Sequence, residues 1–285
     1  AFQLGMLMRE KVMDVLEAYT GNRVNYGVGT VGGVRWDITP EVDAVVRDMI
    51  RYYRSEFSAF YDIVTQDPVA RARMRNVGVL SYEDAIRLCA LGPTARASGV
   101  RCDLRWSAPY EAYGDLDVKP VVPQDYVGEA RGDVFDRFLV RVLEVYQSLD
   151  LMEKILDGLP EGDIVFEKSV VKVLSLLKKA EGTGWGVIEA PRGDDTHVVH
   201  LTSGNENLTW WKVRAPTYAN AVSWPVMFMG NELADAPLII NSIDPCISCM
   251  ERMLVTNSGT GGEQIMTREQ LLNLSREKTR RLMPA

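Results

Sequence analysis

Two long stretches of helical spacing constrain what this chain can fold into more than any other feature of its sequence. From Pro40 to about Val64, apolar residues recur every three or four positions, and the same spacing returns from Val134 to Leu156. This is the period of one face of an amphipathic α-helix. Shorter helices are predicted at residues 2–18, 68–75, 82–89 and 170–177, and the polar segment 266–281 has the composition of a final helix. The chain is therefore predicted to be mainly α.

The pattern changes after Gly182, where short apolar runs alternate with Gly and Asn. The runs cover residues 185–189, 197–201 and 208–213, which is typical of a small antiparallel sheet. A compact apolar segment follows at 225–249, and the proline-containing segment 92–123 is expected to be extended and irregular. The simplest architecture is one mainly helical domain with a small antiparallel β insert.

Composition excludes several classes of protein. With 285 residues and 46% hydrophobic side chains, the chain can bury a substantial core, which excludes disorder. Its net charge of −7 gives no basic field for nucleic acid. The apolar runs, such as 222–230 and 236–240, are shorter than the roughly 20 residues of a membrane helix. Four scattered cysteines do not form a disulfide scaffold, which favours a reducing compartment.

The first residue, Ala1, lies in a segment that already has helical apolar spacing and no capping residue before it. We expect the sequence to begin within a helix and to be the later part of a longer polypeptide.

Residues Gly27 to Gly32 match the pattern G-x-G-x-x-G. A dinucleotide-binding loop of this kind follows a buried strand and opens directly into a helix. Here the next helix start signal is Thr39-Pro40-Glu41, and Val24-Asn25-Tyr26 is a poor strand. We interpret the motif as a glycine-rich connection.

The sharpest chemical feature is the segment Asp244-Pro245-Cys246-Ile247-Ser248-Cys249. Two thiols at C-x-x-C spacing can direct both sulfurs to one soft metal ion such as nickel, iron or zinc. Two buried reduced cysteines are the simpler alternative, and a redox pair would need a thioredoxin-like βαβ context. A structural zinc site would need two further ligands, for which the candidates are Cys89, Cys102, His197 and His200.

Two more segments carry candidate polar groups. In Glu189-Ala190-Pro191-Arg192-Gly193, an arginine between Pro and Gly can donate a forked pair of hydrogen bonds, although such an arginine is more often part of a structural ion pair with a nearby carboxylate. The segment Pro216-Thr217-Tyr218-Ala219-Asn220 taken alone indicates a cap and a helix start.

In this order, the three segments resemble the catalytic large subunit of nickel-iron hydrogenases, which carries E-A-P-R-G, P-[ST]-x-x-N and D-P-C-x-x-C. Earlier segments resemble the energy-converting, membrane-bound branch, which is related to the 49 kDa subunit of respiratory complex I. These segments are Thr20–Arg23, Gly32–Val34, Leu91–Gly99, Asp103–Arg105 and Pro109–Tyr113. The resemblance extends over nearly the whole chain to Arg252 and implies a helical, hydrogenase large-subunit-like domain.

The resemblance also implies roles for individual residues. Cys246 matches the terminal nickel ligand and Cys249 the thiolate that bridges nickel and iron. Arg192 matches the guanidinium over the open coordination site, with Asp244 and Pro191 beside it. Thr217 matches the hydroxyl that hydrogen-bonds a cyanide on iron. The complex I subunit lacks this cysteine pair, so its retention here favours a metal.

The implied activity is reversible, heterolytic cleavage of dihydrogen to protons and electrons at a nickel-iron centre with CO and cyanide ligands on iron. Cys246 and Arg192 are the two candidate bases. The implied partners are a small iron-sulfur electron-transfer subunit, membrane ion-pumping subunits and a maturation protease. The implied location is cytoplasmic, peripheral on the inner face of the cell membrane through partner subunits. The alternatives are a nickel-free docking subunit of a complex I-related ion-pumping oxidoreductase and an isolated, zinc-stapled helical protein.

Two departures from the family pattern matter. The other C-x-x-C pair of the family lies upstream of Ala1, so this chain carries half of the ligand set. Arg252 stands where many relatives have a metal-binding His, although members of the energy-converting branch also have Arg there.

The resemblance divides the chain into a domain at 1–252 and a C-terminal extension at 253–285. In this family such an extension is commonly removed after nickel insertion, just after the position of Arg252. The extension is therefore expected to be a precursor tail, or else a retained helix that docks a neighbour through Leu271, Leu272 and Leu274.

Overall fold

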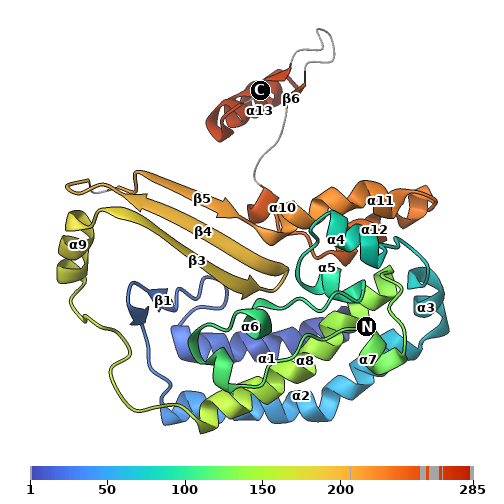
Figure 1. Ribbon diagram of the computed structural model, residues 1–285, viewed down its shortest axis with the longest axis horizontal. Helices are drawn as coiled ribbons and strands as arrows, with labels where there is room; N and C mark the ends of the chain where they lie inside the picture. Colours follow the sequence, from blue (N-terminus) through green and yellow to red (C-terminus); the bar gives the residue numbers. More distant parts are fainter. Residues whose placement is uncertain (1, 206, 251–254, 257–262, 265, 283–285) are drawn as a thin grey trace. The chain divides into compact units, whose positions relative to one another are not determined.

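The computed structural model describes residues 2–205, 207–250, 255–256, 263–264 and 266–282 (Figure 1). The chain divides into two compact units, Ala1–Pro245 and Cys246–Ala285. The predicted domain boundary between residues 252 and 253 falls within 251–254, outside the described residues, and stays a prediction.

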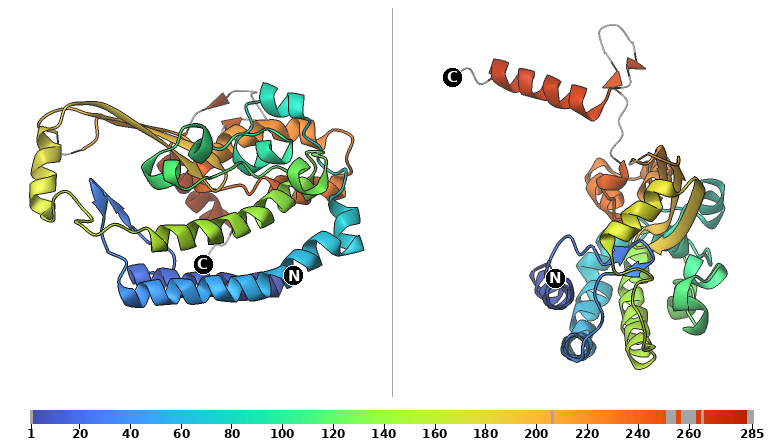
Figure 2. Two further views of the ribbon diagram at one scale, coloured as in Figure 1. Left: turned by 60° about the horizontal axis from the view of Figure 1, so that its bottom comes forward. Right: turned by 90° about the vertical axis from the view of Figure 1, so that its left-hand side faces the viewer.

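Three long helices form one side of the first unit: α1 (Phe2–Thr20), α2 (Pro40–Gln66) and α8 (Val134–Asp157). The left view of Figure 2 shows them running along one another. The side chain of Thr39 caps α2 by accepting a hydrogen bond from Val42 N, and Pro40 occupies the first turn. The helices share a buried apolar core that includes Met8, Val42, Val46, Met49, Ile50, Tyr53, Phe57, Val142 and Leu149.

The opposite face of α8 packs on a second group of shorter helices. These are α3 (Pro68–Met74), α4 (Tyr82–Arg87), α5 (Gly92–Ala97), α7 (Gln124–Val127), α11 (Trp224–Phe228) and α12 (Ala236–Ser242). Their core includes Leu80, Val134, Phe135, Leu139, Met227, Ile239 and Ile243. Asp133 caps α8 by accepting from Asp136 N. Both long helices predicted from the sequence are confirmed, since α2 and α8 extend each prediction by only one or two residues at the C-terminal end.

The predicted β insert is also confirmed. Strands β3 (Gly182–Ala190), β4 (Gly193–Leu201) and β5 (Trp210–Arg214) form an antiparallel sheet in that order. The register pairs Ala190 with Gly193, and Thr196 with Arg214. The sheet projects from the helices (Figure 1), and α9 (Val170–Lys179) precedes it.

The prediction that residues 92–123 are irregular was wrong in part. Besides α5, this segment contains α6 (Leu104–Ser107) and a 3₁₀ turn at Glu111–Asp115. Pro93 lies in the first turn of α5, where its missing N–H costs no hydrogen bond, and Asp103 caps α6. Helices of four to six residues are too short to show a 3.6-residue period, so the spacing could not reveal them.

The interpretation of the G-x-G-x-x-G motif as a connection is confirmed. Strands β1 (Gly29–Thr30) and β2 (Gly33–Val34) form a small antiparallel hairpin, and the next helix is α2. The motif therefore does not join a strand directly to a helix.

The second unit contains a 3₁₀ turn at Ser248–Met250, a two-stranded pairing of β6 (Val255–Thr256) with β7 (Glu263–Gln264), and α13 (Arg268–Leu282). The predicted final helix is confirmed. Among the helices that the structure describes, none combines the length and apolarity that crossing a membrane requires.

Candidate functional site

The connection between β3 and β4 presents Arg192. Because Ala190 pairs with Gly193, only Pro191 and Arg192 lie between the two strands. Gly193 has φ 129°, a conformation that favours glycine. The short turn therefore fixes the backbone of Arg192 at the end of the sheet that meets the helices (Figure 1).

Arg192 is paired with Asp244. Its Nε lies 2.8 Å from Oδ2 of Asp244, its Nη2 donates to Oδ1 at 3.1 Å, and Nε also donates to the Asp244 main-chain oxygen at 3.1 Å. Asp244 follows α12 and has φ 56°, which is uncommon for a residue with a side chain. The structure thus brings together two of the predicted site residues. It also contains the ion pair that the simpler interpretation of Arg192 anticipated.

Asn220 holds this turn in place. It is fully buried at the end of α10 (Pro216–Asn220). Its Oδ1 accepts from Leu91 N at 2.8 Å, and its Nδ2 donates to Leu91 O at 3.3 Å and to Arg192 O at 3.1 Å. Through its amide, Asn220, the last residue of the P-T-x-x-N segment, is hydrogen-bonded to Leu91 and to Arg192, which are both distant from it in sequence. Sequence reasoning interpreted this segment as a helix start and as one of the three family motifs, but it gave Asn220 no role of its own.

Thr217 lies in the same short helix and is also fully buried. The predicted role of its hydroxyl remains a prediction.

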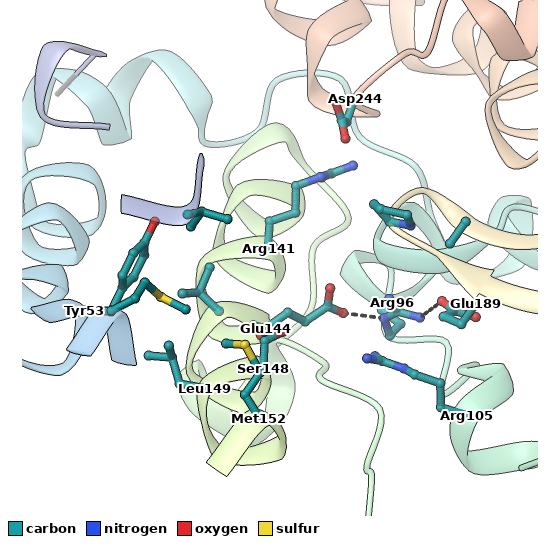
Figure 3. Close-up of a pocket in the computed structure, with 15 residues that line it drawn as sticks. Tyr53, Arg96, Arg105, Arg141, Glu144, Ser148, Leu149, Met152, Glu189 and Asp244 are labelled. Atoms are coloured by element: carbon teal, nitrogen blue, oxygen red, sulfur yellow. Dashed lines mark hydrogen bonds and ion pairs between the residues drawn. The ribbon is translucent and has the colours of Figure 1, made fainter. Parts of the chain in front are cut away.

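A cavity of about 490 Å³ lies between α1, α2, α8 and the β3–β4 turn. Pro191 is among its lining residues, and Figure 3 shows Asp244 at one end and Ser148 and Met152 toward the other end. Its walls are apolar on the side of α1 and α2, where Val12, Met49 and Tyr53 contribute, and charged on the other side.

The charged wall is built around Arg96. Its Nε donates to Glu144 at 2.8 Å and its Nη1 to Glu189 at 2.8 Å, while Asp103 lies 3.7 Å away and is itself paired with Arg105 at 2.7 Å. Burial acts to lower the pKa of Arg96, but Glu144, Glu189 and Asp103 outweigh it and raise that pKa. Burial raises the pKa of Glu189.

Arg141 lines the same cavity, one helical turn before Glu144. Its Nη1 donates to Arg137 O at 2.8 Å, and its buried Nε and Nη2 have no hydrogen-bond partner among the described residues. Burial lowers its pKa to about 10. Figure 3 shows its guanidinium directed toward Asp244.

Sequence reasoning did not select Arg96, Arg141 or Glu144 as site residues. Two of them interrupt the apolar spacing between Val134 and Leu156 as a cation and a carboxylate three residues apart. Charged residues on the apolar face of a long helix are the signal that could have found them.

Cys246 and Cys249 lie in the second unit. The N–H of Cys249 donates to the Cys246 oxygen at 3.1 Å, which makes a single turn, and Cys246 Sγ lies 3.0 Å from Ser248 Oγ. Arg252 is outside the described residues, so its predicted position stays a prediction.

The other candidate zinc ligands have different surroundings. His197 stacks on Trp211 and accepts from its Nε1 at 3.1 Å, and His200 lies 2.8 Å from Thr183 Oγ1. Burial raises the pKa of Cys102 to about 11. Within the part of the chain that the structure describes, no three His, Cys, Asp or Glu residues are grouped to hold a metal.

Comparison with known proteins shows what this chain is similar to. The chain is 45% identical over 283 residues to the membrane-bound hydrogenase subunit alpha of Pyrococcus furiosus. It is 34% identical over 271 residues to formate hydrogenlyase subunit 5 of Escherichia coli, and 33% identical over 253 residues to the C/D subunit of NADH-quinone oxidoreductase from Phocaeicola vulgatus. These alignments cover 99%, 95% and 88% of this chain, respectively. By their names, all three relatives are subunits of a hydrogenase, a hydrogenlyase or an oxidoreductase.

The family can be stated more narrowly. Residues 1–252 match the family described as respiratory-chain NADH dehydrogenase, 49 kDa subunit, and the chain belongs to this family. The resemblance recognised in the sequence, to a hydrogenase subunit related to the 49 kDa subunit of complex I, is confirmed. The chain spans 66% of the length of the P. furiosus relative, and 45% and 46% of the E. coli and P. vulgatus relatives.

Proposed function

We propose that this chain is the catalytic subunit of an energy-converting nickel-iron hydrogenase that interconverts dihydrogen with protons and electrons. The observation that carries the proposal is the pairing of Arg192 with Asp244 at 2.8 Å. Asp244 precedes Cys246 by two residues in the sequence, so the arginine is paired with the segment that supplies the thiols. The hydrogenase subunits among the relatives support the same activity.

The donor set fits the proposed centre in its chemistry. Cys246 and Cys249 lie within one turn, and thiolates are the ligands that nickel and iron in such sites prefer. The thiolates of Cys246 and Cys249 would be the residues of this chain that hold the metal centre. When bound, the nickel-iron group with its CO and cyanide ligands supplies the site that polarises dihydrogen and accepts its electrons.

The residues of the first unit have separate tasks in this proposal. Asp244 fixes the plane of the Arg192 guanidinium through Nε and Nη2, which leaves Nη1 as the donor that orients the reacting molecule. Because Nε and Nη2 of Arg192 are already engaged by Asp244, we assign its guanidinium an orienting task rather than that of a general base. Asn220 fixes the main chain of the same arginine, and the Thr217 hydroxyl would donate to a cyanide on iron.

We also propose the assembly in which this chain works. Its partners would be a small iron-sulfur subunit, which takes the electrons, and membrane ion-pumping subunits that hold the chain at the cytoplasmic face of the membrane. The names of the relatives, membrane-bound hydrogenase and NADH-quinone oxidoreductase, support such an assembly. A maturation protease would remove the segment after Arg252.

Metal analysis of the purified multisubunit complex tests the proposal. We expect about one nickel per catalytic chain, together with uptake of dihydrogen in the presence of an artificial electron acceptor. A fully assembled complex that contains iron-sulfur clusters but neither nickel nor hydrogen uptake would instead identify a nickel-free docking subunit.

A further inference from the structure

Arg141 has a hydrogen-bonding edge that no residue in the described part of the chain uses. It lines the charged cavity from α8, and its Nη1 donates to the main-chain oxygen of Arg137, one helical turn earlier, at 2.8 Å. Its Nε and Nη2 are buried and have no hydrogen-bond partner among the described residues. In an arginine, these two nitrogens present the parallel pair of N–H groups that fits the two oxygens of one carboxylate. Arg141 therefore directs a carboxylate-binding edge into the cavity.

Two neighbouring arginines use this same edge to bind a carboxylate. Arg105 donates through Nε to Oδ1 of Asp103 at 3.0 Å and through Nη2 to Oδ2 at 2.7 Å. Arg192 contacts Asp244 in the same way, with Nε 2.8 Å from Oδ2 and Nη2 donating to Oδ1 at 3.1 Å. The edge of Arg141 offers the same two donors, but no carboxylate of the described residues accepts from them.

The nearby carboxylates are already engaged elsewhere. Figure 3 shows the Arg141 guanidinium directed toward Asp244, but both oxygens of Asp244 are held by Arg192. Glu144, which follows Arg141 on the same helix, accepts from Nε of Arg96 at 2.8 Å. A carboxylate that pairs with Arg141 therefore comes from outside the described residues of this chain.

The burial of Arg141 makes an unpaired edge costly. Burial lowers the pKa of Arg141 to about 10, so the guanidinium still carries its charge at neutral pH. A buried charge is tolerated in a protein when a hydrogen-bonded counter-ion accompanies it. The charged groups that act on Arg141 are the carboxylates of Asp244 and Glu144 and the guanidiniums of Arg96 and Arg192. Together with Arg141 itself, these groups carry one net positive charge.

The rest of the charged wall shows where an anion is favoured. Beside Arg96, the side chains of Asp103, Arg105 and Glu189 together carry one net negative charge. The charged wall is therefore neutral as a whole, and its positive end is at Arg141. An anion that enters the cavity is attracted to that end.

We propose that the Nε and Nη2 edge of Arg141 is a carboxylate-binding site of this cavity, separate from the Arg192–Asp244 pair. The carboxylate belongs either to a small free anion, for which formate is the simplest probe, or to an acidic side chain supplied within the assembled complex. A volume of about 490 Å³ has room for on the order of ten water molecules at roughly 30 Å³ each, so it admits either group. The inference does not depend on the proposed hydrogenase function, because it uses only the contacts of Arg141 and its neighbours.

Calorimetric titration of the intact complex with sodium formate, compared with sodium chloride at the same ionic strength, tests for the free anion. We expect saturable binding of formate in the wild type, weakened at least about tenfold in Arg141→Gln. Arg141→Lys keeps the charge but not the fork, so its affinity should lie between those two. Lys154→Gln removes a cation from an exposed position of the same helix and should bind formate as the wild type does.

Two results of this titration would overturn the proposal. One is formate binding that is as tight in Arg141→Gln or Arg141→Lys as in the wild type. The other is chloride binding that equals formate binding, since a spherical ion does not use the fork.

If the intact complex takes up no formate, its structure by electron cryo-microscopy decides the second source. An acidic side chain with both oxygens on Nε and Nη2 of Arg141 would support the proposal, with the assembled complex as the source of the carboxylate. Water or a main-chain carbonyl on that edge, in a complex that binds no formate, would overturn it. Neither readout involves dihydrogen, so a complex without nickel or hydrogen uptake would refute the proposed function while the Arg141 site is still decided by these measurements.

Discussion

The main chains of Gly92 and Gly193 are in direct contact. A Cβ added to Gly92 would lie 2.4 Å from the Cα of Gly193, and one added to Gly193 would lie 2.7 Å from the Cβ of Leu91. Both residues also have positive φ angles, 56° and 129°. The β3–β4 turn can therefore approach the N-terminus of α5 only because neither residue has a side chain.

Gly193→Ala should destabilise the protein by about 2–5 kcal/mol, because the new methyl group meets backbone and the φ angle is strained. Urea unfolding followed by circular dichroism measures the loss. Gly184→Ala is the matched control, since a Cβ there meets nothing within 4 Å, and it should change the free energy of unfolding by less than about 1 kcal/mol. Equal effects of the two substitutions would contradict the close approach.

Asn220→Ala should lower the free energy of unfolding by about 2–4 kcal/mol. The substitution leaves Leu91 N, Leu91 O and Arg192 O without their hydrogen-bond partner at a buried position. It should also lower hydrogen uptake, since the main chain of Arg192 is no longer fixed. Unfolding and uptake are measured on the same preparation. Asn25→Ala, at an exposed position, should leave both unchanged; a stable Asn220→Ala protein would show that the amide does not hold the turn.

Arg192→Lys should assemble with normal nickel and yet turn over at least about two orders of magnitude more slowly. A lysine ammonium is a point charge and cannot present the planar fork that Asp244 fixes. Metal analysis with hydrogen-uptake assays checks both parts. The conservative control is Arg214→Lys on β5, which is paired with Asp194 in the sheet; wild-type turnover in metal-replete Arg192→Lys would remove Arg192 from the mechanism.

Cys246→Ser and Cys249→Ser should each abolish hydrogen uptake and lower bound nickel, because an alcohol does not ionise or bind a soft metal as a thiolate does. Cys89→Ser, at an exposed cysteine, should retain both nickel and activity. Nickel content by mass spectrometry on the purified complex decides the assignment, and full nickel in either of the first two variants would refute it.

Glu189→Gln should change how stability depends on pH. Burial raises the pKa of Glu189 above its ordinary value of 4.5, so between those two pKa values the folded state binds more protons than the unfolded state. Over this window the free energy of unfolding of the wild type should fall as the pH rises, and the variant should lack that part of the decline. Urea unfolding at several pH values from about 4 upward measures the two slopes, and parallel slopes would contradict the raised pKa.

The sequence predicts those parts of the molecule that have a long helical period or carry a distinctive motif. Helices α2 and α8 have many turns, so their period is plain, and the E-A-P-R-G and D-P-C-x-x-C segments led directly to Arg192 and Asp244. Asn220 and Leu91 are 129 residues apart, and nothing local to either residue indicates their contact. Arg141 and Glu144 were passed over because a long amphipathic pattern tolerates isolated charged positions, and only the folded chain shows that both line a cavity.

The seam formed by Gly92, Gly193 and Asn220 has a consequence for substitutions elsewhere in this chain. It consists of main-chain atoms and one amide. It includes neither thiol of the cysteine segment nor any of the three carboxylates around Arg96, which belong to Asp103, Glu144 and Glu189. Reactive groups can thus be exchanged while the frame that presents them stays the same. Substitutions in the cysteine segment or among the carboxylates beside Arg96 should therefore leave in place the main-chain contacts that present Arg192.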